Sequence, residues 1–375
     1  ALPHSSLTPT EQMLWAIDAE LQDEYDLCQG TAEFWAQASY EASDWSAVAD
    51  QLDARLRKLS QGKGGAEFLS PYRRDRLSNR LIRALEDAGR QDEIIPLCER
   101  EARETGSYMR LIAHLKHAKR WAEVEEWIRK GIAATHQQSP GIAAQLRNTL
   151  RERREEQQQW PQVAAFYAED FFDRPGAATL RDLLKAAKHA GVEADVRAGA
   201  FHYLETGVRP QTLKPAKKTG ALPAWPLPAC EVPEIGEGRT AMAAPMRQAL
   251  IDIAIDEKQP DEVLRWYDQP APNKTSAWGY GWQDDDRIAT AVVSAHPDRA
   301  IAMWKKMVDA QIQQVQVRAY ETAATYLRKI HSAYKKHDRE QEWKDYLAAL
   351  RQANLRRPRL VQILDGLTGK RIVEM

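Results

Sequence analysis

Hydrophobic residues along most of the chain recur at the three- and four-residue spacing of an α-helix. Tyr108, Leu111, Ile112 and Leu115 show it clearly, because positions i, i+3, i+4 and i+7 lie on one face of a helix. No stretch shows the alternation of a strand, so the sequence predicts an all-α protein that is more than half helical. The same helical spacing returns in Trp121–Ile132, Trp160–Phe171, Leu180–Ala187, Tyr320–Leu327 and Trp343–Leu350.

Helix start signals support this prediction. Thr8, Pro9 and Glu11 place a capping hydroxyl before the helix, a proline at its first position and a carboxylate at its third. Such residues satisfy the free amide groups of a helix N-terminus. The pairs Ser70-Pro71 and Ser139-Pro140 have the same order, and we expect Pro260 and Pro297 in first turns as well.

The helices are predicted to come in pairs, and the second helix of each pair opens alike. Asp44–Val48, Arg120–Val124 and Gln159–Val163 each place Val three positions after Trp. Degenerate copies about 30 to 47 residues apart predict a right-handed α-solenoid of tetratricopeptide-like helix-turn-helix repeats. We expect the Trp residues at repeat positions to be core residues, with two of them, Trp121 and Trp160, buried where one hairpin meets the next. Weaker copies begin at Gln91, Gln259, His296 and Glu342, and the Trp residues expected in the core are Trp45, Trp121, Trp160, Trp304 and Trp343.

One proline-rich stretch, residues 208–238, interrupts the helical pattern. Its six prolines cannot belong to a continuous helix, because proline removes an amide donor and fixes φ. The stretch divides the chain into helical segments 1–207 and 239–375. Trp225, Leu227 and Val232 favour a strap docked on the helices over a free linker, which would have little use for such apolar side chains.

Several helical segments resemble the region that follows the zinc finger in bacterial SWIM zinc-finger proteins. The likeness is carried by Trp45–Asp50, Ala84–Arg90, Trp127–Ile132 and the tail Leu364–Ile372. The resemblance implies a tetratricopeptide-like fold. The family's C-x-C and C-x-H ligands are absent from this sequence. The resemblance therefore implies the helical C-terminal part of such a protein, with the metal module before residue 1.

Charge and cysteine content narrow the functional classes. Over 375 residues, 53 basic and 54 acidic residues leave a net charge of -1, so no global field attracts a polyanion. No apolar run of about 18 residues is present, so no membrane partner is expected. Cys28, Cys98 and Cys230 are widely spaced, which fits a reducing cytoplasm better than a disulfide framework. We expect Cys98 in the core.

Motifs that carry chemistry are not found. His114 and His117 have a spacing that can share a metal ion, but no third ligand is evident. Asp284–Asp286 lacks the spacing of a calcium loop, and we interpret it as helix-capping carboxylates before Ile288. No nucleophile motif or phosphate loop occurs. The sequence thus predicts a non-catalytic protein without cofactor or metal.

Two clusters remain as candidate ligand-binding residues. Arginines on one predicted helix could form either a salt-bridged solvent face or a surface for an anionic ligand. Aromatic residues that alternate with glycine could bind a ligand or fold into the solenoid groove. We predict a scaffold that binds a protein or peptide in its groove; the alternative is a nucleic-acid-associated module using arginine-rich helix faces. The candidates are Arg73, Arg74, Arg76 and Arg80 in the first cluster and Trp278, Tyr280 and Trp282 in the second.

Overall fold

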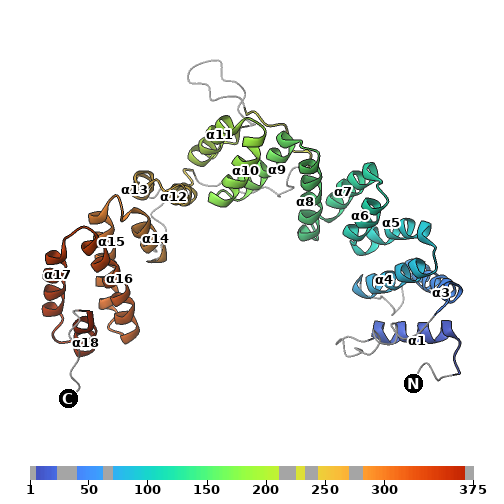
Figure 1. The fold of residues 1–375 in the computed structure, drawn as a ribbon, viewed down its shortest axis with the longest axis horizontal. Helices are drawn as coiled ribbons and strands as arrows, with labels where there is room; N and C mark the ends of the chain where they lie inside the picture. The colour runs from blue at the N-terminus through green and yellow to red at the C-terminus, as the bar shows by residue number, and fades with distance from the viewer. Residues whose placement is uncertain are drawn as a thin grey trace. The chain divides into compact units, whose positions relative to one another are not determined.

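The computed structural model describes residues 6–22, 40–61, 71–210, 225–232, 244–269 and 282–367. All regular secondary structure in these ranges is helical, and its α-helices hold more than half of the 375 residues (Figure 1). The prediction of an all-α fold is therefore confirmed. The right-handed path of a solenoid stays a prediction.

The helices pack into two compact units. The first comprises Ala1–Val163 with Cys230–Ile235, and the second comprises Ala164–Ala229 with Gly236–Met375. This division differs from the predicted one at 208–238. The reason is that Cys230–Val232 packs with helices of the first unit, whereas Trp225 packs with the second, as described below.

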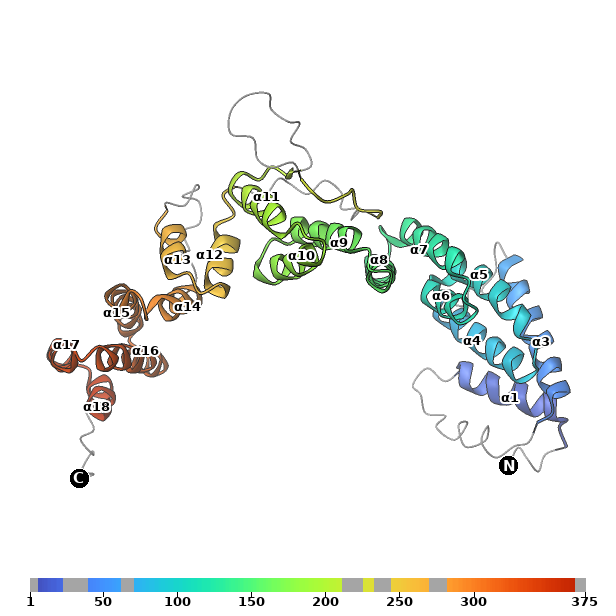
Figure 2. The same cartoon turned by 45° about the horizontal axis from the view of Figure 1, so that its top comes forward.

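The first unit is built from consecutive helices that each contact their nearest neighbours. α6 packs against both α7 and α8, and α4 packs against α1, α3 and α5 (Figures 1 and 2). Contacts between neighbours in sequence are the signature of stacked helical hairpins. The elements are α1 (Pro9–Gln22), α3 (Ala42–Gln61), α4 (Pro71–Asp87), the 3-10 helix η2 (Gln91–Glu93), α5 (Ile94–Thr105), α6 (Tyr108–His117), α7 (Trp121–Thr135) and α8 (Pro140–Glu156).

The second unit repeats the same arrangement. α10 packs against α11 and α12, and α16 packs against α15, α17 and α18 (Figure 2). α9 (Trp160–Asp173) begins in the first unit and lies mostly in the second. The other helices are α10 (Ala177–His189), α11 (Glu193–Thr206), α12 (Arg247–Asp256), α13 (Pro260–Tyr267), α14 (Trp282–Val292), α15 (Pro297–Gln313), α16 (Val317–Lys336), α17 (Glu340–Ala353) and α18 (Pro358–Leu367).

The predicted repeat motif sets the core through its last residue. In five of the seven copies the residue four positions after the polar opening residue is buried, because the first full turn of the helix brings it onto the face that packs against neighbouring helices. These residues are Val48, Val124, Val163, Val263 and Ala300. The copies that begin at Gln91 and Glu342 bury Ile94 and Trp343 instead.

The expectation that all the repeat tryptophans are core residues is wrong for three of them. Trp45, Trp121 and Trp160 are only half-buried, whereas Trp304 and Trp343 are buried. Each half-buried ring lies on the edge of its helix while the motif's valine fills the interior. The guanidinium of Arg153 lies over the Trp121 ring, 4.2 Å from its centre, and covers one face of it.

Helix ends follow the predicted signals. Pro9 and Pro71 are the first residues of their helices, and Pro140, Pro260 and Pro297 lie in the first turns of theirs. The amide of Thr8 donates to Glu11 Oε2 at 2.8 Å, and the amide of Glu11 donates back to Thr8 Oγ1 at 3.3 Å. This reciprocal pair caps α1 as the sequence predicts.

Residues 225–232 of the proline-rich stretch are docked, which confirms that part of the strap prediction. Leu227 and Val232 are buried, 7% and 8% exposed. The Trp225 ring lies 5.5 Å from the ring of Phe172 on α9 and fills the space beside Gly199 on α11, where a Cβ atom would come within 2.7 Å of it. Glycine at position 199 is therefore what admits the indole ring.

Candidate peptide-binding groove

A groove of about 420 Å³ runs along α10 in the second unit. α11 and α12 form its other sides, and its apolar lining comes from Leu180, Leu184 and Ile253. Leu180 and Ile253 are buried and form the floor, whereas Leu184 stays half-exposed. The groove therefore offers apolar surface to a ligand without being a closed cavity.

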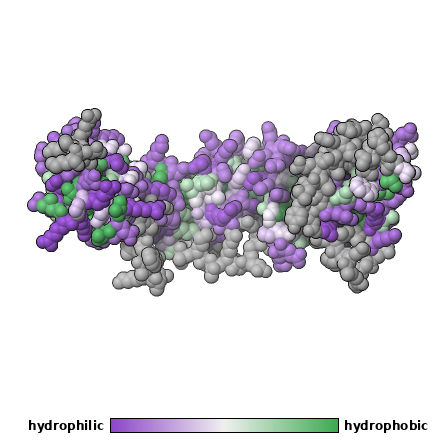
Figure 3. All heavy atoms as spheres, turned by 90° about the horizontal axis from the view of Figure 1, so that it is seen from below, coloured by the Kyte–Doolittle hydropathy of each residue, from purple (hydrophilic) through white to green (hydrophobic). Residues whose placement is uncertain are grey.

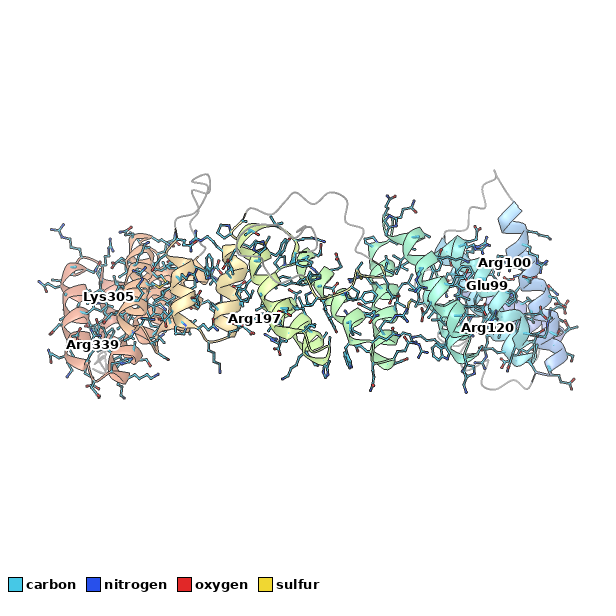
Figure 4. The ribbon with its side chains drawn as sticks, turned by 90° about the horizontal axis from the view of Figure 1, so that it is seen from above. Glu99, Arg100, Arg120, Arg197, Lys305 and Arg339 are labelled. Carbon is cyan, nitrogen blue, oxygen red and sulfur yellow. The ribbon has the colours of Figure 1, made fainter. Side chains whose placement is uncertain are left out.

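Basic side chains line the edge of the groove, and two of them are paired with acids of α12. Arg181 donates to Asp256, and Arg197 donates through both Nη atoms to Glu257 at 2.5 and 2.7 Å. Figure 4 labels Arg197 where the ribbons of α11 and α12 meet. Its hydrogen bonds to Glu257 hold the pKa of Arg197 above its ordinary value. These ion pairs connect the C-terminal end of α12 to α10 and α11.

Lys185 and Lys188 also line the groove, from the exposed side of α10. Neither lysine forms an ion pair with another residue of the described ranges. Among the cations that line this groove, their ammonium groups are thus the ones that no carboxylate of the described residues neutralises. Glu193 is the one acid of the lining that forms no ion pair with the described residues.

The groove continues past the N-terminus of α10. A second depression of about 430 Å³ is lined by Gly176, Ala177 and Thr179, and it shares Ala177 and Asp256 with the first. Its polar wall is the ion pair between Arg287 of α14 and Asp252 of α12. The two depressions together form an elongated surface along α10 and α12, which suits an extended or helical peptide better than a small compact molecule.

The predicted arginine cluster on α4 lies in the first unit, away from this groove along the chain. Arg74 is 8% exposed and donates to both carboxylate oxygens of Glu101 on α5, at 2.7 and 3.0 Å. Arg80 is paired with Glu20 of α1. Arg73 and Arg76 are half-buried and also have partners within the chain. Arg74 and Arg80 therefore join helices to one another.

Other arginines of the described residues also pair with carboxylates of the chain. Arg83 pairs with Asp87, Arg351 pairs with Asp365, and Arg154 is paired with Glu125 and Glu231. The described surface seen from below in Figure 3 is mostly hydrophilic, with small hydrophobic areas between. The sequence left open whether such arginines form a salt-bridged face or a surface for an anionic ligand, and the residues named here form salt bridges within the chain.

The aromatic cluster can be placed only in part. Trp278 and Tyr280 lie outside the described residues, and Trp282 is the first residue of α14. Asp284 and Asp285 lie in the first turn of α14, in line with the expected acidic helix start, but Asp285 and Asp286 also bond to other helices. Asp286 accepts hydrogen bonds from Trp304 Nε1 at 2.8 Å and Lys329 Nζ at 2.6 Å, which joins α14 to α15 and α16.

Asp285 also reaches a neighbouring helix. Its carboxylate accepts a hydrogen bond of 2.9 Å from the hydroxyl of Tyr267, the last residue of α13. Burial and this hydrogen bond raise the pKa of Tyr267 to about 12. Asp285 and Asp286 thus join α14 to neighbouring helices. Their spacing along the sequence did not predict these contacts.

Metal binding or nucleophilic catalysis would require clustered ligands or an accessible, activated side chain. Within the described ranges, no three His, Cys, Asp or Glu side chains lie close enough to hold a metal ion. Burial lowers the pKa of His114, the half-buried member of the His114–His117 pair. Cys98 is 1% exposed, as predicted, and burial raises the pKa of its thiol to about 11, so it is a packed residue and a poor nucleophile.

No helix in the described part of the chain has the length and apolar character needed to cross a membrane. In the comparisons with known proteins, no family model matches this chain, and no similar curated protein was found. The resemblance to SWIM zinc-finger proteins therefore stays a prediction from the sequence.

The groove was not among the sites predicted from the sequence. A signal was present, because Leu184, Lys185 and Lys188 lie together on α10 and combine an exposed apolar position with two cations. The other wall, α12, begins at Arg247, 58 residues after α10 ends at His189. Only folding brings Ile253 and Asp256 beside them.

Proposed function

We propose that this chain is a non-catalytic helical-repeat scaffold that binds an acidic, partly apolar segment of a protein partner in the α10–α12 groove. The observation that carries the proposal is the combination of a leucine-lined groove with Lys185 and Lys188, two exposed cations that have no partner among the described residues. Apolar side chains of a peptide would bury surface against Leu184, and its carboxylates would reach the lysines.

The extent of the groove also favours an elongated ligand. The two adjoining depressions follow α10 and α12 and are open along their length. A peptide with apolar residues on one side and acidic residues on the other would match both, in the way amphipathic helices bind grooves. Placement in the cytoplasm and descent from bacterial SWIM zinc-finger proteins belong to the same proposal and rest on the sequence alone.

A labelled 15-residue peptide with Leu at helical spacing and Glu elsewhere would test the proposal. We expect fluorescence anisotropy to show binding by the full chain and weakening by at least about tenfold in the Lys185→Glu/Lys188→Glu variant. A matched peptide with Lys in place of Glu should not bind. The binding should weaken with salt, because exposed charges are screened over about 8 Å at physiological ionic strength.

The matched control is Lys335→Glu/Lys336→Glu, which reverses two exposed lysines in the last turn of α16. This variant has the same net charge as the groove variant. Equal loss of binding in both variants would show a non-specific charge effect and would contradict the groove. Binding unaffected by either variant would contradict it as well.

The alternative of nucleic-acid association is not favoured by a particular feature of the described residues. Its arginines at Arg74, Arg80 and Arg154 already bind carboxylates of the chain. A steep salt dependence of binding to an oligonucleotide would revive this alternative.

A further inference from the structure

An arginine clamp in the first unit holds the strap of residues 225–232 by its carboxylate. Arg154 on α8 is 6% exposed and donates from Nε and Nη2 to the two oxygens of Glu231, at 2.6 and 2.8 Å. Arg129 on α7 donates to the same carboxylate at 3.0 Å. Bidentate pairing by a buried guanidinium is a strong and geometrically specific way to bind a carboxylate.

The clamp also recognises the residue after the carboxylate. Nε of the buried Arg147 donates to the carbonyl oxygen of Val232 at 3.4 Å. Val232 itself is 8% exposed. The site therefore receives a glutamate, a main-chain carbonyl and a small aliphatic side chain from two successive residues. This is the pattern of an extended-peptide site, and the chain itself supplies the peptide.

Arg154 also has partners outside the strap. Glu125 on α7 accepts from Nη1 and Nη2 of Arg154 at 2.8 and 2.7 Å, and Gln157 accepts from Nη1 at 2.9 Å. These partners hold the Nη1 side of the guanidinium, while Glu231 takes the Nε side. Departure of Glu231 would leave a donor pair that Glu125 and Gln157 still orient, which is what preorganised binding requires.

The strap of residues 225–232 lies outside the helices. Residues 225–232 have no helical hydrogen bonds, and Pro228 and Ala229 between the two anchored parts are exposed. Segments of this kind open locally at a small part of the free energy of global unfolding. The strap can therefore leave the clamp while α7 and α8 remain folded.

We propose that the clamp of Arg129, Arg147 and Arg154 is a second peptide-binding site, for an extended segment of a partner protein with Glu followed by a small aliphatic residue, and that the strap occupies it as an internal competitor. The strap is tethered to the chain, so its high effective concentration excludes weak ligands. A partner that repeats the Glu231-Val232 pattern exchanges with it. This site is separate from the α10–α12 groove and does not depend on the function proposed for that groove.

The test uses a labelled peptide with the sequence of residues 225–232, in which Ser replaces the cysteine. The full chain with Glu231→Ala and Val232→Ser has an unoccupied clamp. We expect this variant to bind the peptide at least about tenfold more tightly than the unaltered chain, because the tethered competitor is gone. A peptide with Gln in place of its Glu should lose the gain. Equal affinity of variant and unaltered chain, or indifference to the Glu-to-Gln change, would overturn the proposal.

Two controls complete the experiment. Glu126→Ala removes an exposed carboxylate of α7 whose ion pair among the described residues is with Lys130, and it should leave peptide affinity unchanged. If the strap variant loses helical circular dichroism, hydrogen exchange of the unaltered chain decides instead. Millimolar peptide should then accelerate exchange of the amides in 227–232 relative to α7 and α8, and no acceleration would reject the exchange.

Discussion

At the scale of single residues, arginine is the side chain that most often joins one helix to another in the described part of the chain. Arg74 is the clearest case, because its guanidinium and the carboxylate of Glu101 are both removed from solvent. Ser78 Oγ also approaches Glu101, and Arg100 donates to it at 3.0 Å. A buried pair of this kind stabilises mainly by keeping each charge from being left alone.

Breaking the Arg74 pair from one side should be costly. We expect Glu101→Gln to lower the free energy of unfolding by ~3 kcal/mol, since a buried guanidinium loses its counter-ion. Replacing both partners, as Arg74→Met with Glu101→Leu, should recover most of that loss. Urea unfolding followed by circular dichroism measures both changes. The control is Asp87→Asn, which breaks the exposed pair with Arg83 and should change stability by less than ~0.5 kcal/mol.

At the scale of elements, helix ends show how the chain turns between packed helices. Gly89, Gly106, Gly191 and Gly207 follow helices with φ near +74°, the left-handed conformation that glycine adopts without strain. Val315, after α15, has φ of 53° and is 63% exposed. A β-branched residue is strained there, because its Cβ substituents crowd the backbone.

Val315→Gly should therefore raise the free energy of unfolding by ~1 kcal/mol, by removing the strain of a left-handed valine. Some of the gain is offset because glycine loses more conformational entropy on folding. The reverse change at an equivalent helix end, Gly191→Val, should destabilise the protein, because it places a β-branched residue at a φ of +73°. No neighbouring atom lies within 4 Å of the added Cβ, so backbone strain alone sets the effect. Thermal melting of both variants measures the pair. A lower melting temperature for Val315→Gly would contradict the assigned backbone strain.

At the scale of the whole molecule, most helix contacts are between neighbours in sequence, and the strap is an exception. Glu231 meets Arg154 across 77 residues of sequence and Arg129 across 102. Hydrogen bonds from Arg154 are the main cause that lowers the pKa of Glu231, and they also lower the pKa of Glu125. Both carboxylates are therefore stabilised in the folded chain in their charged form.

This long-range anchor predicts a pH dependence. A carboxyl whose pKa is lower in the folded state adds stability above its unfolded pKa, about 4.3 for Glu. That stability is lost as the pH falls through the folded pKa of Glu231. At pH 7 we expect Glu231→Gln to have a lower urea midpoint than the unaltered chain, and the difference should disappear in acid. Glu126→Gln on the exposed side of α7 should show no such difference, and a constant gap at all pH values would contradict the linkage.

The sequence by itself determined the elements of this protein and much of its core. Apolar spacing of 3.6 residues and the local chemistry of Thr8, Pro260 and Pro297 act within one or two helical turns, so they can be read without a fold. The burial of Val124 and Val163 follows from the same local pattern. The half-exposed Trp121 does not, because its environment depends on Arg153 from the next helix.

Only the tertiary structure decided which charges are internal and where a ligand could bind. The composition of α4 presents Arg74 and Arg80 as a basic face, but their partners Glu101 and Glu20 come from other helices. The groove needs α12 beside α10, and the clamp needs Glu231 beside Arg154. Pairing between distant segments depends on how whole helices pack, and that information is spread over many residues rather than written in one motif.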